Sequence, residues 1–151
     1  MIYKPANFIL QEFVSRRVYE DRGERSWELL DEKLLRSLQE IREYTGGRVV
    51  LNDWYWKGNR EYQVFREMEY YGGRSFSQHA FGRAADPRLY NSNSSGGGKM
   101  TADESRALIL SMKRMGKLEF VTAMEDIVDW LHIDCRMTER GGEEDLFIFK
   151  P

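Results

Sequence analysis

The sequence predicts an α+β domain, in which helices come first and later strands form a small antiparallel sheet flanked by helices. Two segments with helical apolar spacing predict the main helices, and several short apolar or aromatic stretches predict the strands. The chain has 151 residues, of which 41% are hydrophobic and 32% charged, as is typical of a globular protein. No internal repeat or linker divides it, so we expect a single domain over residues 1–151.

The clearest predicted helix runs from Asp31 to Tyr44. Its apolar face is formed by Leu34, Leu38 and Ile41, which recur at helical spacing. The two glycines that follow at 46 and 47 end it.

A second helix is predicted after Thr101, because Thr101 and Glu104 have the spacing of a capping box. We expect it to end at Gly116. The apolar residues expected on its buried face are Leu108, Met112 and Met115.

The remaining N-terminal and central segments carry weaker signals. Phe8–Val14 is predicted to form a short helix capped by Asn7, and the charged segment Val18–Ser26 a loop. Asp53–Phe76 is aromatic and polar without clean periodicity, which predicts long loops with a short hairpin. The tract Asn91–Gly98 is rich in serine, asparagine and glycine, which predicts a flexible loop.

Strands are predicted at Arg48–Asn52, Leu118–Thr122, Trp130–Arg136 and Leu146–Lys150. Side chains alternate along a strand, so His132, Asp134 and Arg136 should share one face. The opposite, core-facing side of that strand is formed by Leu131, Ile133 and Cys135, which makes this cysteine a buried and inert thiol.

Charge and composition exclude several classes of protein. The net charge is -2 with a pI near 5.8, and no basic patch dominates, so nucleic acid is not an expected partner. A single cysteine excludes an intramolecular disulfide and fits synthesis in a reducing compartment. The N-terminus lacks the apolar core of a signal peptide, and no stretch approaches a membrane span. We therefore expect a monomer that is made in the cytoplasm without a signal peptide and does not insert into membranes.

The chain has two histidines, and each lies near an acidic residue at a spacing that suits a metal site. His79 precedes Asp86 by seven residues, and the small residues between them allow the chain to turn and bring both side chains together. His132 lies two residues before Asp134, which could hold the imidazole by a hydrogen bond. One histidine alone is usually an ordinary polar residue, but two imidazoles and a carboxylate are a standard ligand set for catalytic zinc.

Two motifs give the sequence a resemblance to a known family. Ser77–Asp86 reads SxHxxGxAxD, and Trp130–Asp134 reads WxHxD. The pair resembles the zinc D-alanyl-D-alanine carboxypeptidase family, which is related to Hedgehog proteins and lysostaphin-type peptidases. The likeness is closest to short phage endolysins of the L-alanyl-D-glutamate endopeptidase type. It extends back to Val50–Trp54, and so spans roughly residues 48–136.

The resemblance implies a Hedgehog and D-Ala-D-Ala peptidase-like fold, with Zn²⁺ held by His79, Asp86 and His132. It also implies a general base three residues before the second histidine, where this chain has Asp129 in place of the usual, longer glutamate. Glu125 and Asp126 are the alternative bases on the approach to the same strand.

The family also uses an arginine upstream of the first histidine to bind a substrate carboxylate, because a guanidinium matches that group. Arg66 lies where that residue is expected, and Arg74 is the alternative. Neither stands in the Gly-Tyr-Arg context that is common in bacterial members.

The resemblance therefore implies a zinc peptidase that cuts peptidoglycan stem peptides, as a carboxypeptidase or an endopeptidase, and reaches the cell wall after release from the cell, as a phage endolysin does. A non-catalytic zinc-binding phage structural or interaction module of the same fold is the competing expectation. A zinc amidase or dipeptidase for small soluble substrates is a third, and a closed pocket rather than an open groove would favour it.

Overall fold

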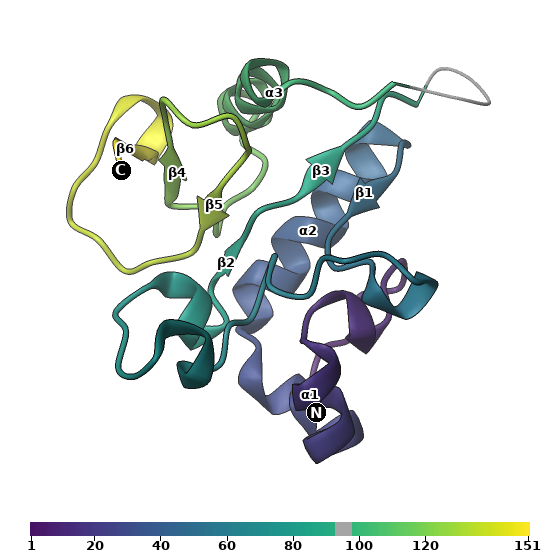
Figure 1. The fold of residues 1–151 in the computed structure, drawn as a ribbon. Coiled ribbons are helices and arrows are strands. Elements are labelled where there is room, and N and C mark those ends of the chain that lie inside the picture. The colour runs from purple at the N-terminus through teal and green to yellow at the C-terminus, as the bar shows by residue number, and fades with distance from the viewer. Residues whose placement is uncertain (93–97) are drawn as a thin grey trace.

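Two small sheets organise the chain in the computed structural model, which describes residues 1–92 and 98–151 (Figure 1). The first sheet pairs β1 (Val49–Val50) with β3 (Arg88–Leu89) in antiparallel orientation. The second has the strand order β2-β5-β4-β6. Its strands are β2 (Ala84–Ala85), β4 (Ala123–Glu125), β5 (Ile133–Asp134) and β6 (Phe147–Phe149). The prediction of a purely antiparallel sheet was wrong, because β6 returns parallel to β4.

Three α-helices accompany these strands: α1 (Arg16–Arg22), α2 (Glu32–Thr45) and α3 (Ala102–Arg114). The helix predicted from Asp31 is confirmed as α2. The side chain of Asp31 accepts a hydrogen bond from the backbone N–H of Lys33, and Gly46 ends the helix with φ 61°. Together, the helices and small sheets make the chain an α+β protein, as the sequence predicts.

The capping box before α3 is confirmed, with Thr101 and Glu104 each accepting a hydrogen bond from the other's backbone N–H. The predicted buried face of this helix was partly wrong. Met115 lies beyond the end of α3 and is 50% exposed, whereas Ile109 and Met112 are fully buried. Met115 is not on the buried face because the helix ends one residue earlier, at Arg114.

The segment before α2 is more helical than the sequence predicts. Val18–Ser26 is not a loop, because α1 runs through its first part and a 3-10 helix, Gly23–Leu29, continues it. Ser15 caps α1 by accepting a hydrogen bond from the N–H of Val18. The charged residues therefore cover one side of a helix whose other side packs into the core.

The expected helix at Phe8–Val14 is reduced to a 3-10 turn at Leu10–Glu12. Asn7 does not cap it. Instead, the side chain of Asn7 accepts a hydrogen bond from Gln39 of α2, and its backbone N–H donates to the same side chain. A tertiary contact has replaced the local one.

Three strand predictions need correction. Leu118–Thr122 is a turn with Leu118 at φ 55°, and β4 begins only at residue 123. The strand predicted at Trp130–Arg136 is confirmed only as the short β5, and β2 and β3 were not predicted. Asp53–Phe76 contains 3-10 turns at Trp54–Trp56 and Met68–Tyr71, and no strand is assigned there. Most of the flexible loop predicted at Asn91–Gly98 lies outside the described residues.

The core forms around α2, which lies behind the strands in the view of Figure 1. This helix contributes four almost completely buried side chains, Leu34, Leu35, Leu38 and Ile41. The β strands pack against it through residues that include Val49, Leu89 and Ile133. Within the described residues, no helix is both long enough and apolar enough to span a bilayer.

Candidate metal centre

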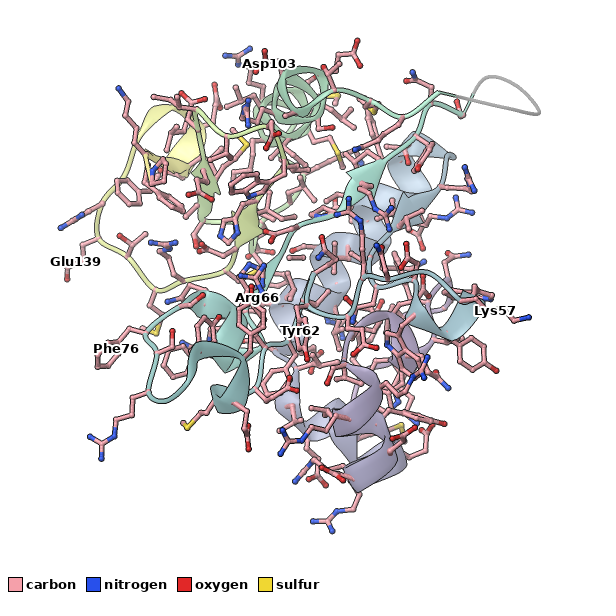
Figure 2. All side chains as sticks on the ribbon, viewed as in Figure 1. Lys57, Tyr62, Arg66, Phe76, Asp103 and Glu139 are labelled. Carbon is pink, nitrogen blue, oxygen red and sulfur yellow. The ribbon has the colours of Figure 1, made fainter. Side chains whose placement is uncertain are left out.

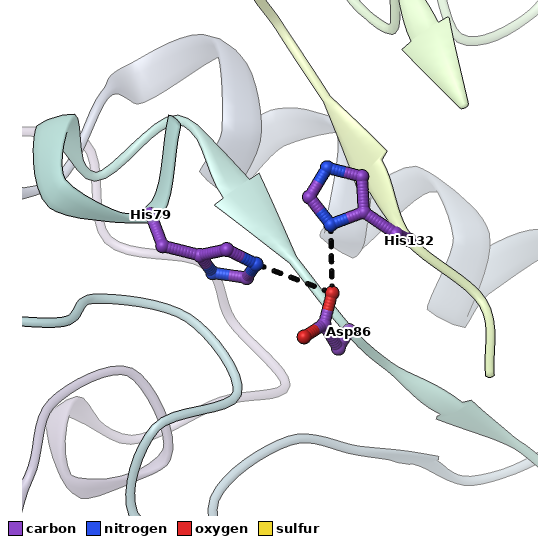
Figure 3. A group of neighbouring side chains, drawn as sticks. All are labelled: His79, Asp86 and His132. Carbon is purple, nitrogen blue, oxygen red and sulfur yellow. Dashed lines mark hydrogen bonds and ion pairs between the residues drawn. The ribbon is translucent and has the colours of Figure 1, made fainter. Parts of the chain in front are cut away.

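The pairing of β2 with β5 brings two of the predicted ligands together. Ala85 is opposite Ile133 in this antiparallel pair, so the next residues, Asp86 and His132, also face each other. His79 comes from a 3-10 turn, Gln78–Phe81, that precedes β2. Two sequence segments separated by more than forty residues therefore meet at one point, as Figure 3 shows.

The turn between His79 and β2 needs a glycine. Gly82 has φ 66°, and a Cβ at this position would lie 2.0 Å from the backbone oxygen of Leu29. The N–H of Asp31 donates to the carbonyl oxygen of Gly82, which ties this turn to the start of α2. The small residues between His79 and Asp86 predicted that the chain could turn here, and the backbone does so.

The three side chains offer converging donor atoms. Asp86 Oδ1 lies 2.8 Å from His132 Nδ1 and 3.2 Å from His79 Nε2. One ligand atom from each residue lies within 4.8 Å of the other two. Donors bound to one tetrahedral zinc ion are separated by roughly 3.3–3.6 Å, since each lies about 2.0–2.2 Å from the metal. The set can hold a metal ion with small adjustments of the side chains.

Outer hydrogen bonds direct one nitrogen of each imidazole toward this point. His79 Nδ1 lies 2.7 Å from the carbonyl oxygen of Val64, which makes Nδ1 a donor and turns Nε2, the nitrogen that would bind a metal, toward Asp86. His132 Nε2 lies 3.0 Å from Asp134 Oδ2, so its Nδ1 is left for the metal. The expected hydrogen bond is therefore present, with Asp134 accepting from His132, and Arg136 in turn donates to both oxygens of that carboxylate.

Burial and charge together shape the protonation of the site. His79 and His132 are 2% and 7% exposed. Burial by itself raises the pKa of Asp86, but hydrogen bonds from His132 and His79 outweigh it and hold the pKa well below its usual range. Burial alone would lower the pKa of His132, yet its hydrogen bonds to Asp134 and Asp86 raise it to about 9. Without a metal, His132 carries the proton that balances these carboxylates.

This proton leads to a prediction about pH. The pKa of His132 is raised from 6.5 to about 9, so its contribution to stability is complete below pH 6.5 and is lost as the pH rises through about 9. We expect the melting temperature of zinc-free protein to fall across this window. Zinc requires the neutral imidazole, so its apparent affinity should rise across the same window by about tenfold per pH unit.

Thermal melts followed by circular dichroism measure the melting temperature of the zinc-free protein at each pH. Competition with a chelator measures the zinc affinity over the same pH range. The pKa of Glu12 is raised to about 7 by burial, so Glu12 also titrates close to the lower end of this pH range. Glu12→Gln removes that titration and is the control. The zinc-free His132→Gln variant should lose the fall in melting temperature. If zinc affinity does not depend on pH in the wild type, proton competition at His132 is wrong.

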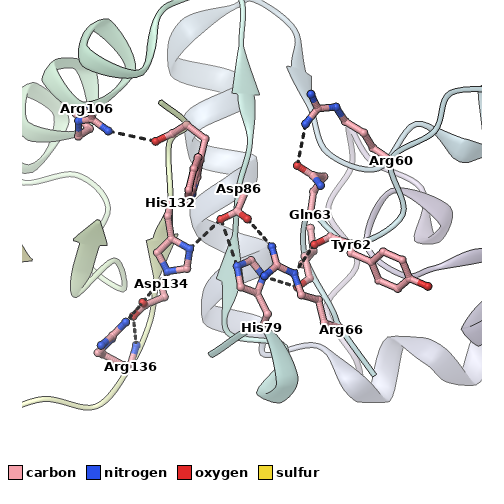
Figure 4. Close-up of polar contacts among 12 residues, drawn as sticks. Arg60, Tyr62, Gln63, Arg66, His79, Asp86, Arg106, His132, Asp134 and Arg136 are labelled. Atoms are coloured by element: carbon pink, nitrogen blue, oxygen red, sulfur yellow. Dashed lines mark hydrogen bonds and ion pairs between the residues drawn. The ribbon is translucent and has the colours of Figure 1, made fainter. Parts of the chain in front are cut away.

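Arg66, which we expected to bind a substrate carboxylate, contacts the predicted metal ligand Asp86. Its Nη2 lies 2.6 Å from Asp86 Oδ2, and its Nε donates to the carbonyl oxygen of Tyr62 (Figure 4). The guanidinium also stacks on Tyr70, and the side chain is only 18% exposed. Arg66 thus fixes the orientation of the Asp86 carboxylate.

We predict that Arg66→Ala weakens zinc binding by about 10- to 100-fold, the usual effect of removing a group that orients a metal ligand. Competition with a fluorescent chelator measures this affinity. Arg74→Ala is the matched control, because Arg74 is exposed and does not line the cavity of the metal centre. Unchanged zinc affinity together with a raised KM would return Arg66 to the role of a substrate-binding residue.

The three ligand residues line a cavity of about 400 Å³ that is open to solvent. Glu125 lines the same cavity, because it follows Met124 in β4 and so lies opposite His132 across the β4–β5 pair. Asp129 is exposed on the bend before β5 and lines an adjoining cavity instead. Asp126 pairs with Arg106 at 3.6 Å and lines neither.

Several residues around the site were not predicted from the sequence. Arg136 lines its cavity, stacks on Phe149 of β6 and orients Asp134. The alternation of side chains after His132 already placed Arg136 on the same face, and that was the available signal. Val64 and Tyr62 contribute only backbone oxygens, for which the sequence carries no signal.

The fold and the site define an α+β protein with a buried candidate metal centre of two histidines and an aspartate. No family model, curated protein or solved structure matches the chain.

Proposed function

We propose that this protein is a zinc peptidase that hydrolyses stem peptides of peptidoglycan, with a fold of the Hedgehog and D-Ala-D-Ala peptidase type. The observation that carries the proposal is the buried group of His79, Asp86 and His132, with one donor atom of each directed to one point. The ligand set is the one used by catalytic zinc, and its cavity is open to solvent. A protein of this kind would act on the cell wall after release.

When bound, zinc would supply polarisation of the scissile carbonyl and a lowered pKa for the attacking water. The chain's own residues would hold and move protons. Asp129 would act as general base, accept a proton from that water and return it to the leaving amine. Glu125 is the competing base, because it lines the same cavity as the ligands.

The backbone between Asp129 and His132 is irregular, as the spacing D-x-x-H requires if Asp129 is to approach the metal centre. In a regular strand, residues three apart face opposite ways, so Asp129 can approach His132 only if the backbone between them is irregular. Residues 127–130 form bends, and Ile127 has φ 65°. This supports Asp129 as a residue that can turn toward the metal centre when substrate binds, since catalytic contacts often tighten only in the complex.

Digestion of purified peptidoglycan tests the proposal. The zinc-loaded protein should release soluble peptide fragments, and mass spectrometry should place one new amino and one new carboxyl terminus within the stem peptide. Protein stripped of zinc should release none until zinc is restored. Zinc binding without fragments would favour the non-catalytic module.

A further inference from the structure

A further contact on His132 comes from β6, the last strand of the chain. This strand is the outermost in its sheet and pairs in parallel with β4, so that Phe149 is opposite Glu125. Between β5 and β6 the chain passes over the surface, where Glu139 projects outward (Figure 2). The chain then returns to the sheet, and the completely buried Leu146 anchors this return. The return places Phe149 in the wall of the cavity that contains the metal centre.

The ring of Phe149 packs against the imidazole of His132. The two ring centroids are 5.8 Å apart and the ring planes are at 84°, which is an edge-to-face arrangement that aromatic rings prefer. Both rings line the cavity of the metal centre. Phe149 thus contacts a predicted metal ligand without being a ligand itself.

This contact opposes a rotation that the hydrogen bonds of His132 do not prevent. Asp86 and Asp134 lie 2.8 Å and 3.0 Å from the two ring nitrogens, so they fix two points of the imidazole. Rotation about the line through these two points would tilt the plane of the ring. The lone pair of Nδ1 lies in that plane, so a tilt would turn it away from a metal ion. A second ring packed at nearly a right angle to the imidazole resists the tilt.

Phe149 is held in turn by Arg136. The guanidinium of Arg136 lies 4.3 Å from the centroid of the Phe149 ring and donates to both oxygens of Asp134. His132, Asp134, Arg136 and Phe149 therefore form a closed cycle of contacts, and Figure 4 shows its polar part. Each member is fixed by two neighbours, so loss of the Phe149 ring would loosen both His132 and Arg136.

We propose that Phe149 is a positioning residue of the metal centre, which holds the His132 imidazole in the plane that directs Nδ1 at the metal. The last strand of the chain then completes the site. The inference rests on the proposed function only in requiring a metal ion bound by the three predicted ligands. Its consequence is that metal affinity depends on an aromatic ring at position 149. Loss of one edge-to-face pair corresponds to a change of about 3- to 10-fold in affinity.

The test compares Phe149→Leu, which keeps an apolar side chain but removes the ring, with Phe149→Tyr, which keeps the ring. Competition with a fluorescent chelator should show zinc binding weakened by about 3- to 10-fold in Phe149→Leu and close to wild type in Phe149→Tyr. Cobalt(II) bound in place of zinc gives a second measurement, because its visible absorption bands depend on the geometry of the ligands. These bands should change in Phe149→Leu and be retained in Phe149→Tyr.

Ile148→Leu is the matched control on the same strand. Side chains alternate along a strand, so Ile148 points away from the face that carries Phe149. Ile148 is 43% exposed and does not line the cavity of the metal centre. The control should leave zinc affinity and the cobalt bands unchanged. If circular dichroism shows that Phe149→Leu does not fold, Phe149→Met replaces it, since methionine is also apolar and lacks the ring.

Wild-type zinc affinity and wild-type cobalt bands in a folded variant without the ring would overturn the inference. Equal losses in Phe149→Leu and Ile148→Leu would also overturn it, because the effect would then belong to the strand and not to the ring. A wild type that binds no metal would contradict the ligand assignment as well. The expected responses in a protein that releases nothing from peptidoglycan would support the role of Phe149 and contradict only the peptidase activity.

Discussion

His79→Ala and His132→Ala are each expected to abolish stoichiometric zinc binding. The wild type should carry about one zinc ion per chain, measured by elemental analysis of protein purified without a histidine tag. Each histidine supplies one of only three protein donors, and each is already oriented by an outer hydrogen bond. Loss of one donor leaves two, too few for the three protein ligands that catalytic zinc sites use.

The control for this experiment is Asp129→Asn, which should retain zinc because Asp129 is exposed and outside the ligand cluster. Both histidines are buried, so circular dichroism must first show that the variants fold. A folded His79→Gln or His132→Gln variant provides the same information if alanine unfolds the chain. Full zinc retention in folded variants of both histidines would contradict the ligand assignment.

Asp129→Asn should lower kcat by about 10² to 10⁴ while zinc stays bound, which is the usual effect of removing a general base. The substitution keeps the size of the side chain and removes its ability to accept a proton. Arg106 holds the bend through the carbonyl oxygens of Val128 and Trp130, so the substitution itself should not change the fold of the bend. Steady-state hydrolysis of an isolated stem peptide gives kcat and KM separately.

Glu125→Gln is the matched comparison, since Glu125 lines the cavity of the metal centre opposite His132. If activity collapses in Glu125→Gln and stays near normal in Asp129→Asn, the base is Glu125. If neither substitution lowers kcat, the mechanism with a carboxylate base is wrong. Zinc content must be measured in both variants, because loss of metal would produce the same loss of rate.

The local sequence was sufficient for the helices with complete end signals. Asp31 marks the start of α2 and Gly46 its end, and the apolar residues between them recur at helical spacing. The helix could therefore be predicted from its own residues. The same holds for the start of α3 at Thr101. The helix α1 was not predicted because its segment is mostly charged. Ser15 caps this helix, and Val18 is buried in the core.

The candidate metal centre was predictable in its residues but not in its arrangement. The sequence alone named His79, Asp86 and His132, because their types and spacing match a zinc ligand set. Only the tertiary structure decided how they meet. The register of β2 against β5 sets Asp86 opposite His132, and such pairing depends on contacts between residues far apart in the chain.

Tertiary structure also decided the roles of the surrounding polar groups. Arg66 contacts Asp86 because the loop after β1 passes beside β2, a proximity that no local pattern encodes. Glu125 reaches the cavity of the metal centre through its register with His132, whereas Asp129, on the bend before β5, lines the adjoining cavity. The sequence by itself determined the kinds of chemical groups and the helix boundaries, since these depend on neighbours along the chain. Pairing, burial and the direction of each side chain depend on neighbours in space, and only the folded chain defines them.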